Sequence, residues 1–167
     1  MSIEERLQKL EDDRAIRDLK ARYLRACDAQ DAETVRDTLL PEGAVIAYEG
    51  FPPFSNRDDF VSVYAQMGCA PGIFDVHHGA NGVVTFESDA RATGQWSLHF
   101  HNINLAARTL TQMGVEYDDV YVKQGGRWWI AETRTRRTSC VIQTVDDAGN
   151  AIVSVMGHPP AVFGDVA

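Results

Sequence analysis

The sequence predicts an α+β fold in which helices come first and a strongly curved antiparallel sheet follows. In the first part of the chain apolar residues recur at helical spacing, and from about Asp75 onward they alternate with polar ones. Turn-forming residues separate the alternating segments. Because strands of ten or more residues must twist or coil, the long segments favour a curved sheet over a flat one. Helices followed by strands are typical of the α+β class.

The first predicted helix begins at Ser2, which forms a capping-box pattern with Glu5. We expect a break at Asp12-Asp13. Apolar residues form one stripe along the helix, and Asp28 lies next to the end of that stripe. The stripe consists of Leu7, Leu10, Ile16, Leu19, Tyr23 and Cys27.

Two shorter helices and a strand are expected next. The second helix covers residues 32–40 and ends at the Pro-Glu-Gly sequence of 41–43. Residues 44–48 form a short strand. The third helix lies near 59–67, after a polar segment that begins at Asn56.

The remaining segments predict the sheet. Alternation covers segments near 81–87, 91–103, 107–123, 127–143 and 151–156. Turn residues at 87–90, 124–126 and 146–150 indicate hairpins between them. Since no internal repeat or long linker divides the chain, we expect one domain over residues 1–167.

Composition argues against several classes of protein. Twenty-four acidic and sixteen basic residues give the 167-residue chain a net charge of −8, a poor match for nucleic acid or anionic lipid. Three widely spaced cysteines without a CxxC pair predict neither a disulfide framework nor a zinc site. The N-terminus lacks the apolar core of a signal peptide, and no apolar run approaches the ~18 residues of a membrane span. We expect a cytoplasmic protein with neither metal nor cofactor.

Asp28 and the pair His77-His78 are the main candidates for catalysis. A neutral imidazole accepts protons near neutral pH, and a carboxylate on its other nitrogen fixes the tautomer and stabilises the imidazolium. Two ordinary explanations stay open. Either histidine can satisfy a backbone carbonyl at a strand edge, and Asp28 can cap the second helix.

The segment 94–102 predicts the wall of a pocket. One face of this strand carries Trp96, Leu98, Phe100 and Asn102, which together describe an aromatic-walled cavity with one polar group. The alternative is that the three apolar residues belong to an ordinary core. The shape of such a pocket would depend on residues from the other elements, namely Ile46, Val61, Tyr64, Met67 and Phe74.

Four short segments resemble the polyketide-cyclase-like (SnoaL-like) branch of the nuclear transport factor 2-like superfamily. They are AIRDL at 15–19 leading to Tyr23 and Asp28, VHHGAN at 76–81, YDDVY at 117–121 and GRW at 126–128. Their order and spacing are similar to those of scytalone dehydratase, bile-acid dehydratase and hexachlorocyclohexane dehydrochlorinase. The resemblance implies a cone-shaped sheet wrapped around N-terminal helices, the cystatin-like α+β barrel. It also implies a deep pocket and self-association, as a dimer or larger, through the outer face of the sheet.

The resemblance also implies roles for single residues. His77 would be the general base and Asp28 would orient it, with His77 preferred over His78 by alignment. Tyr48 matches a tyrosine that polarises a substrate carbonyl, and Asn102 stands where scytalone dehydratase has a second catalytic histidine. Tyr23 replaces a pocket lysine of the dehydrochlorinase.

The last long strand departs from the family. Thr133 stands where many relatives have an arginine and is therefore expected to contact the ligand, and the neighbouring Arg134 should face the other side of the sheet. We expect the basic run Arg134, Arg136 and Arg137 to form a solvated or dimer-facing surface.

The expected function is that of a cofactor-free lyase or isomerase. It would act on a small hydrophobic cyclic carbonyl compound such as a steroid, polyketide or aromatic-pathway intermediate. The alternative is a non-catalytic module that binds a hydrophobic ligand, or a small subunit that accompanies an oxygenase. A cofactor-independent monooxygenase is a third possibility. Val162 and Phe163 of the tail are expected either to cover the pocket mouth as a lid or to be disordered.

Overall fold

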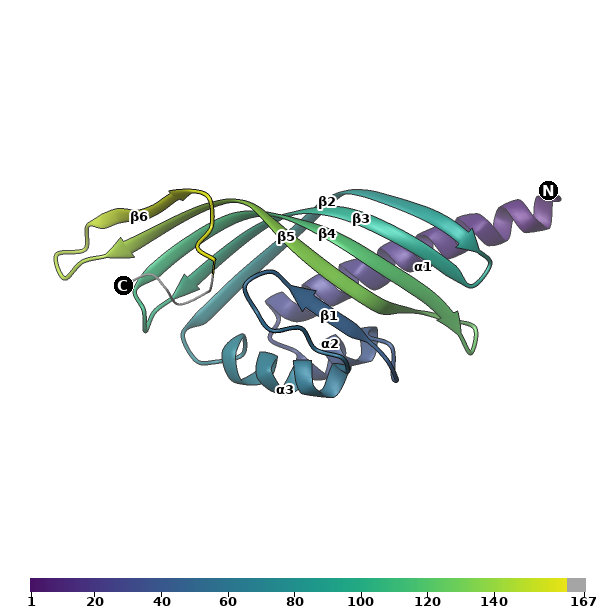
Figure 1. Ribbon diagram of the computed structural model, residues 1–167, viewed down its shortest axis with the longest axis horizontal. Coiled ribbons are helices and arrows are strands. Elements are labelled where there is room, and N and C mark those ends of the chain that lie inside the picture. The colour runs from purple at the N-terminus through teal and green to yellow at the C-terminus, as the bar shows by residue number, and fades with distance from the viewer. Residues whose placement is uncertain (162–167) are drawn as a thin grey trace.

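The computed structural model describes residues 1–161 and confirms the α+β fold (Figure 1). Within this range three helices lie on one side of a curved six-stranded sheet. The helices are α1 (Ile3–Asp28), α2 (Ala32–Thr38) and α3 (Arg57–Met67). The strands are β1 (Val45–Tyr48), β2 (Ile73–Ser88), β3 (Arg91–Asn104), β4 (Thr109–Gln124), β5 (Arg127–Val145) and β6 (Ala151–Gly157).

The strand order is β1-β5-β4-β3-β2, with β6 paired to the far end of β5. Consecutive long strands form antiparallel hairpins, with turns at the three predicted places. β1 is the exception to the antiparallel prediction, because it pairs with β5 in parallel. The edges of the sheet do not pair with each other, so the sheet is curved but open.

Helix α1 is continuous, so the predicted break at Asp12-Asp13 is wrong. The Asp12 carboxylate is buried, and its Oδ1 accepts hydrogen bonds from Trp128 Nε1 and Lys123 Nζ, both at 2.7 Å. Asp13 is paired with Arg17 one turn later. Both carboxylates therefore have partners, and neither needs to interrupt the helix.

The apolar stripe of α1 packs against the sheet only over its second half. Ile16, Leu19, Tyr23 and Cys27 are buried, as predicted, and they are covered by β2 and β5. Leu7 and Leu10 are exposed because the N-terminal part of the helix extends beyond the sheet (Figure 1). The prediction that Leu7 and Leu10 belong to the buried stripe is therefore wrong.

The elements after α1 differ from prediction mainly at their ends. Helix α2 ends at Thr38 instead of residue 40, since the backbone N–H of Leu40 donates to Ile130 on β5. Strand β2 begins at Ile73, before the predicted segment near 81–87 and close to Asp75, where the alternating pattern starts. It continues through an irregularity at Asn81, whose φ of 53° lies in the left-handed region and shifts the register with β3.

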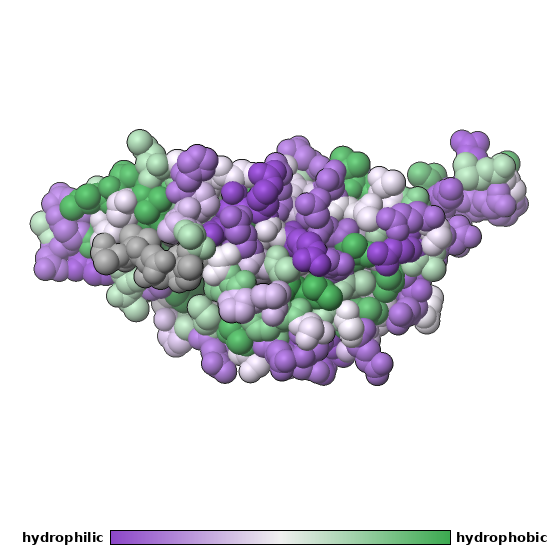
Figure 2. Space-filling model, viewed as in Figure 1, coloured by the Kyte–Doolittle hydropathy of each residue, from purple (hydrophilic) through white to green (hydrophobic). Residues whose placement is uncertain are grey.

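Several apolar side chains of the sheet are exposed on the surface of the protein. Figure 2 shows them gathered over β6, where Ile152, Val153 and Met156 are exposed. Self-association through the outer face of the sheet stays a prediction. In the described part of the chain, no helix has the length and apolar character needed to cross a membrane.

A buried ion pair joins α1 to the sheet. Lys20 Nζ lies 2.8 Å from Asp119 Oδ2, and both side chains are almost completely inaccessible to solvent. The ammonium also lies 3.5 Å from the ring centroid of Tyr117, and the Tyr121 hydroxyl donates to Asp119 at 2.7 Å. Burial lowers the pKa of Lys20, while Asp119 opposes that shift by favouring the charged form. Each charge is therefore tolerated in the core only because the other is present.

Replacing one member of this pair is expected to destabilise the protein strongly. Asp119→Ala leaves the Lys20 ammonium buried without its counter-ion and should lower the free energy of unfolding by about 3–5 kcal/mol. The double variant Lys20→Met/Asp119→Asn removes both charges and should recover most of that loss. Urea denaturation followed by circular dichroism measures both.

The exposed pair formed by Arg14 and Asp18 on the same helix is the control. Asp18→Ala should leave the urea midpoint unchanged, because solvent screens this pair. An equal effect of Asp18→Ala and Asp119→Ala would contradict the assignment of the buried pair as a structural link.

Candidate active site

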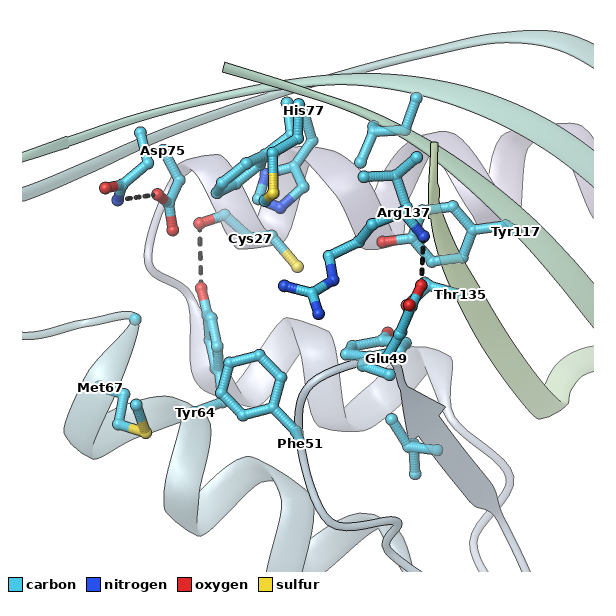
Figure 3. A pocket seen from close by; sticks show the side chains of 18 of the residues that line it. Cys27, Glu49, Phe51, Tyr64, Met67, Asp75, His77, Tyr117, Thr135 and Arg137 are labelled. Atoms are coloured by element: carbon cyan, nitrogen blue, oxygen red, sulfur yellow. Dashed lines mark hydrogen bonds between the residues drawn. The ribbon is translucent and has the colours of Figure 1, made fainter. Parts of the chain in front are cut away.

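A cavity of about 360 Å³ lies where α1 ends, between the concave face of the sheet, β1 and α3 (Figure 3). Its volume is that of a site for a small molecule. Most of the wall is apolar or aromatic. Residues of this kind come from β1, the loop after it, α3, β3 and β4: Ile46, Phe54, Phe60, Leu98, Phe100 and Met113.

The structure brings Asp28 and His77 together at the wall of this cavity. His77 Nδ1 lies 2.7 Å from Asp28 Oδ1, and the backbone N–H of His77 donates to the same oxygen at 2.8 Å. Because an ionised carboxylate only accepts hydrogen bonds, Nδ1 carries the proton and the lone pair lies on Nε2. The imidazole packs against Phe100, with ring centroids 4.9 Å apart.

The ordinary explanations for these two residues do not fit the geometry. The N-cap of α2 is Asp31, whose carboxylate accepts from Thr34, so Asp28 is not the cap. His78 is exposed on the opposite face of β2, whereas His77 lines the cavity. Of the two histidines, His77 is therefore the one that faces the cavity.

Near the dyad, the end of α1 packs closely on β2 at a glycine. A Cβ at Gly79 would lie 2.5 Å from Leu24 Cδ1, so a larger residue there would require the Leu24 side chain to move. Gly79 and Leu24 lie close to His77 and Asp28 in the chain.

Tyrosine hydroxyls form a second polar group on the wall. The hydroxyls of Tyr23 and Tyr48 are hydrogen-bonded to each other, and Tyr117 lies beside Tyr48, with ring centroids 6.0 Å apart. All three line the cavity. Burial raises the pKa of each phenol well above its ordinary value, so the hydroxyls stay protonated and can donate hydrogen bonds.

Asn102 and Asp75 form a third polar group, beside the dyad. Asn102 lines the cavity, as the strand pattern predicts, and its Nδ2 donates to Asp75 Oδ1 at 2.7 Å. Asp75 was not predicted as a site residue. One signal was present in the sequence, because Asp75 precedes His77 by two residues and alternate residues of a strand share a face. Its pairing with Asn102 on β3 became apparent only from the strand register.

Three residues predicted to bind ligand do not line the cavity. Trp96 shares a face of β3 with Leu98 and Phe100, but it lies under α1, where Arg17 covers its ring and its Nε1 donates to Tyr121. Phe74 is exposed because alternation turns its neighbours Ile73 and Asp75 inward instead. Thr133 is buried behind the Tyr48 hydroxyl, away from the cavity surface.

Of the pocket-shaping residues, Ile46, Tyr64 and Met67 line the cavity, whereas Val61 is buried outside it and Val63 lines it instead. The Tyr64 hydroxyl donates to the backbone carbonyl of Cys27 at 2.9 Å. Burial raises the pKa of the Cys27 thiol to about 12, which keeps it protonated and unreactive.

Arg137 is a cavity residue that the sequence analysis assigned to the surface. It is buried, while Arg134 and Arg136 of the same run are exposed and paired with Glu132 and Glu116. Because alternate residues of a strand face the same side, Arg137 points inward, as Thr133 does. The prediction treated the three arginines as one charged surface and so missed this alternation.

Arg137 forms hydrogen bonds with two other parts of the chain, the residue after β1 and the segment after β6. Its backbone N–H donates to Glu49 at 2.6 Å, and its Nη2 donates to the carbonyls of Pro160 and Ala161. The chain after β6 therefore returns to a residue of the cavity wall. Val162 and Phe163, the predicted lid residues, lie outside the described residues.

The polar groups of the cavity suit proton transfer and hydrogen bonding. Within residues 1–161, no three His, Cys, Asp or Glu side chains are grouped in a way that would hold a metal ion.

Comparisons with solved structures agree with this architecture. A hexachlorocyclohexane dehydrochlorinase (LinA, type 2) is 16% identical with a TM-score of 0.74, covering 93% of this chain and 99% of its own. A scytalone dehydratase-like protein from Novosphingobium aromaticivorans is 18% identical with a TM-score of 0.74, covering 96% and 98%. A cystatin-like protein of unknown function from Nostoc punctiforme is 17% identical with a TM-score of 0.62, covering 75% and 90%. At these identities the likeness shows the fold.

Family membership follows from the sequence match. The SnoaL-like domain matches residues 8–134 of the 167, a range that includes most of α1 with Asp28, β2 with His77 and most of the cavity wall. This chain therefore belongs to the SnoaL-like domain family of the nuclear transport factor 2-like superfamily.

Proposed function

We propose that the protein is a cofactor-free lyase or isomerase that removes a proton next to the carbonyl group of a small hydrophobic cyclic compound. A steroid, a polyketide or an aromatic-pathway intermediate has the required character. The observation that carries this proposal is the 2.7 Å hydrogen bond between His77 Nδ1 and Asp28 Oδ1 at the wall of an apolar cavity.

His77 acts as the general base in this proposal. Its Nε2 accepts the proton, and the resulting imidazolium is stabilised by the Asp28 carboxylate on Nδ1. Asp28 is itself held in place by the backbone N–H of His77, so the ring and the carboxylate keep a fixed relation. This arrangement fixes the tautomer before the substrate binds.

The tyrosine pair stabilises the enolate that proton removal creates. Negative charge develops on the carbonyl oxygen, and a preorganised donor in an apolar surrounding stabilises it most. Tyr23 and Tyr48 line the cavity and bond to each other, so one hydroxyl can turn its proton toward the substrate oxygen. Asn102 is less suited to this task because its amide already donates to Asp75.

The family neighbours support a lyase. The similar structures include proteins described as a dehydrochlorinase and as a scytalone dehydratase, both names of eliminating enzymes. The rival function, a module that only binds a ligand, requires neither a base nor its orienting carboxylate. A fixed hydrogen bond between two such groups on an accessible cavity wall therefore favours catalysis.

Substitution of the dyad tests the proposal. We expect His77→Ala to lower kcat by about 10²–10⁴-fold, because the general base is lost. Asp28→Asn should also lower kcat, since the neutral amide no longer stabilises the imidazolium. Exchange of the α-protons of cyclic ketones in D₂O, followed by proton NMR, measures the step without knowledge of the natural substrate.

His78→Ala is the matched control, because it removes the neighbouring imidazole from the exposed face of the same strand. It should keep the wild-type exchange rate. If the His77→Ala and Asp28→Asn variants both exchange α-protons at the wild-type rate, the dyad mechanism is wrong. Ketone binding without exchange in the wild type would favour the binding module.

Loss of a tyrosine hydroxyl should affect the same reaction in a different way. We expect Tyr23→Phe and Tyr48→Phe each to lower kcat, by about 10²-fold for the one that donates to the oxyanion, with a smaller change in KM. Steady-state kinetics on a ketone found by the exchange assay measures both constants.

Tyr121→Phe removes a buried hydroxyl that bonds to Asp119 outside the cavity and serves as the control. It should lower stability and leave kcat unchanged. Equal kcat values for all three variants would argue against the tyrosine pair as the oxyanion donor.

A further inference from the structure

Asp75 contributes a carboxyl group to the wall of the cavity next to His77, whereas Asp28 lies behind the His77 ring. It lies two residues before His77 on β2, and alternate side chains of a strand point to the same face. Figure 3 shows Asp75 and His77 side by side along the wall. Both line the cavity, so a molecule in contact with the imidazole can also reach this carboxyl.

The two oxygens of Asp75 have different surroundings. Asn102 is its direct partner on β3, and the Asn102 amide donates to Oδ1 at 2.7 Å. Within residues 1–161 this is the one hydrogen bond to the Asp75 carboxyl. Because Oδ1 is occupied, Oδ2 is the oxygen that carries the proton when Asp75 is protonated.

The surroundings of Asp75 raise its pKa, so its carboxyl group keeps its proton to a higher pH than that of an ordinary aspartate. Burial is the largest effect and raises the pKa of Asp75, and the nearby Asp28 carboxylate raises it further. The hydrogen bond from Asn102 and the charge of His77 act in the opposite direction. Cys27 and Tyr64, the other titratable groups on this side of the cavity, keep their protons because burial raises the pKa of each.

We propose that Asp75 is a general acid that protonates the leaving oxygen when a hydroxyl group is eliminated from the substrate. The proposal rests on the proton abstraction by His77 proposed above and adds a second catalytic residue to it. Hydroxide is a poor leaving group and needs a proton in the transition state, whereas a halide departs without one. A carboxyl next to the base supplies that proton.

The step balances with these two groups alone. His77 Nε2 takes the proton from the carbon next to the carbonyl, and the C–H electron pair forms the new C=C bond. The C–O bond breaks, and the oxygen takes the proton of Asp75 and leaves as water. His77 ends as imidazolium and Asp75 as carboxylate, and transfer of one proton between them restores the resting state.

Two substrates that differ only in their leaving group test this role. One is a cyclic β-hydroxy ketone and the other is its β-chloro analogue, with the uncatalysed loss of chloride subtracted. We expect Asp75→Asn to lower kcat/KM for loss of water by about 10²-fold or more, the usual contribution of a general acid. The same variant should eliminate chloride within about threefold of the wild-type rate, because that reaction needs only the base.

Two further variants act as controls. Asp75→Glu keeps a carboxyl group and should recover part of the lost dehydration rate. Asp89→Asn changes an exposed aspartate in the turn between β2 and β3 and should leave both reactions unchanged. Circular dichroism of each variant confirms that the fold is kept.

The outcomes separate this proposal from the function on which it rests. Equal loss of both eliminations in Asp75→Asn would give Asp75 a positioning role, and an unchanged dehydration rate would remove it from the mechanism. Either result overturns the acid role while His77→Ala still abolishes chloride elimination. If His77→Ala leaves chloride elimination intact, or the wild type eliminates neither group across a panel of ring sizes, the proposed function fails as well.

Discussion

The position of α1 on the concave face of the sheet is the constraint on which the rest of the structure depends. The helix has 26 residues and is about 39 Å long at the usual rise. The longest strand has 19 residues and extends over about 60 Å. Because the N-terminal part of α1 extends beyond the sheet, the helix covers one end of the concave face and leaves the other end uncovered. The cavity lies at the uncovered end, between the sheet, β1 and α3.

The helix is held in that position by contacts of different kinds. Its apolar stripe packs on β2 and β5, and the buried ion pair between Lys20 and Asp119 joins the helix to β4. At its end, Leu24 packs over Gly79, and Asp28 is bonded to the ring and the backbone N–H of His77. The packing that stabilises the fold therefore also sets the geometry of the dyad.

This arrangement explains the distribution of polar groups in a largely apolar cavity. Asp28, His77 and Asp75 lie on the side formed by the end of α1 and by β2, while Tyr48 and Tyr117 come from β1 and β4. A substrate between them would meet proton-transferring groups on one side and hydrogen-bond donors on the other. The apolar wall strengthens both kinds of interaction because water is excluded from them.

The sequence by itself determined the class of fold, the succession of helices and hairpins, and the pairing of Asp28 with His77. The fold class and the succession of elements follow from local periodicity and turn residues, which neighbouring positions in the chain carry, whereas the pairing of the distant Asp28 and His77 was predicted from the family resemblance. Tertiary structure decided which residues of a predicted face reach the cavity. Trp96 and Leu98 share one face of β3, yet of the two only Leu98 lines the cavity, because Arg17 of α1 covers the ring of Trp96. The partnership of Lys20 with Asp119, and that of Asp75 with Asn102, depend on helix docking and strand register, which bring together positions far apart in the chain.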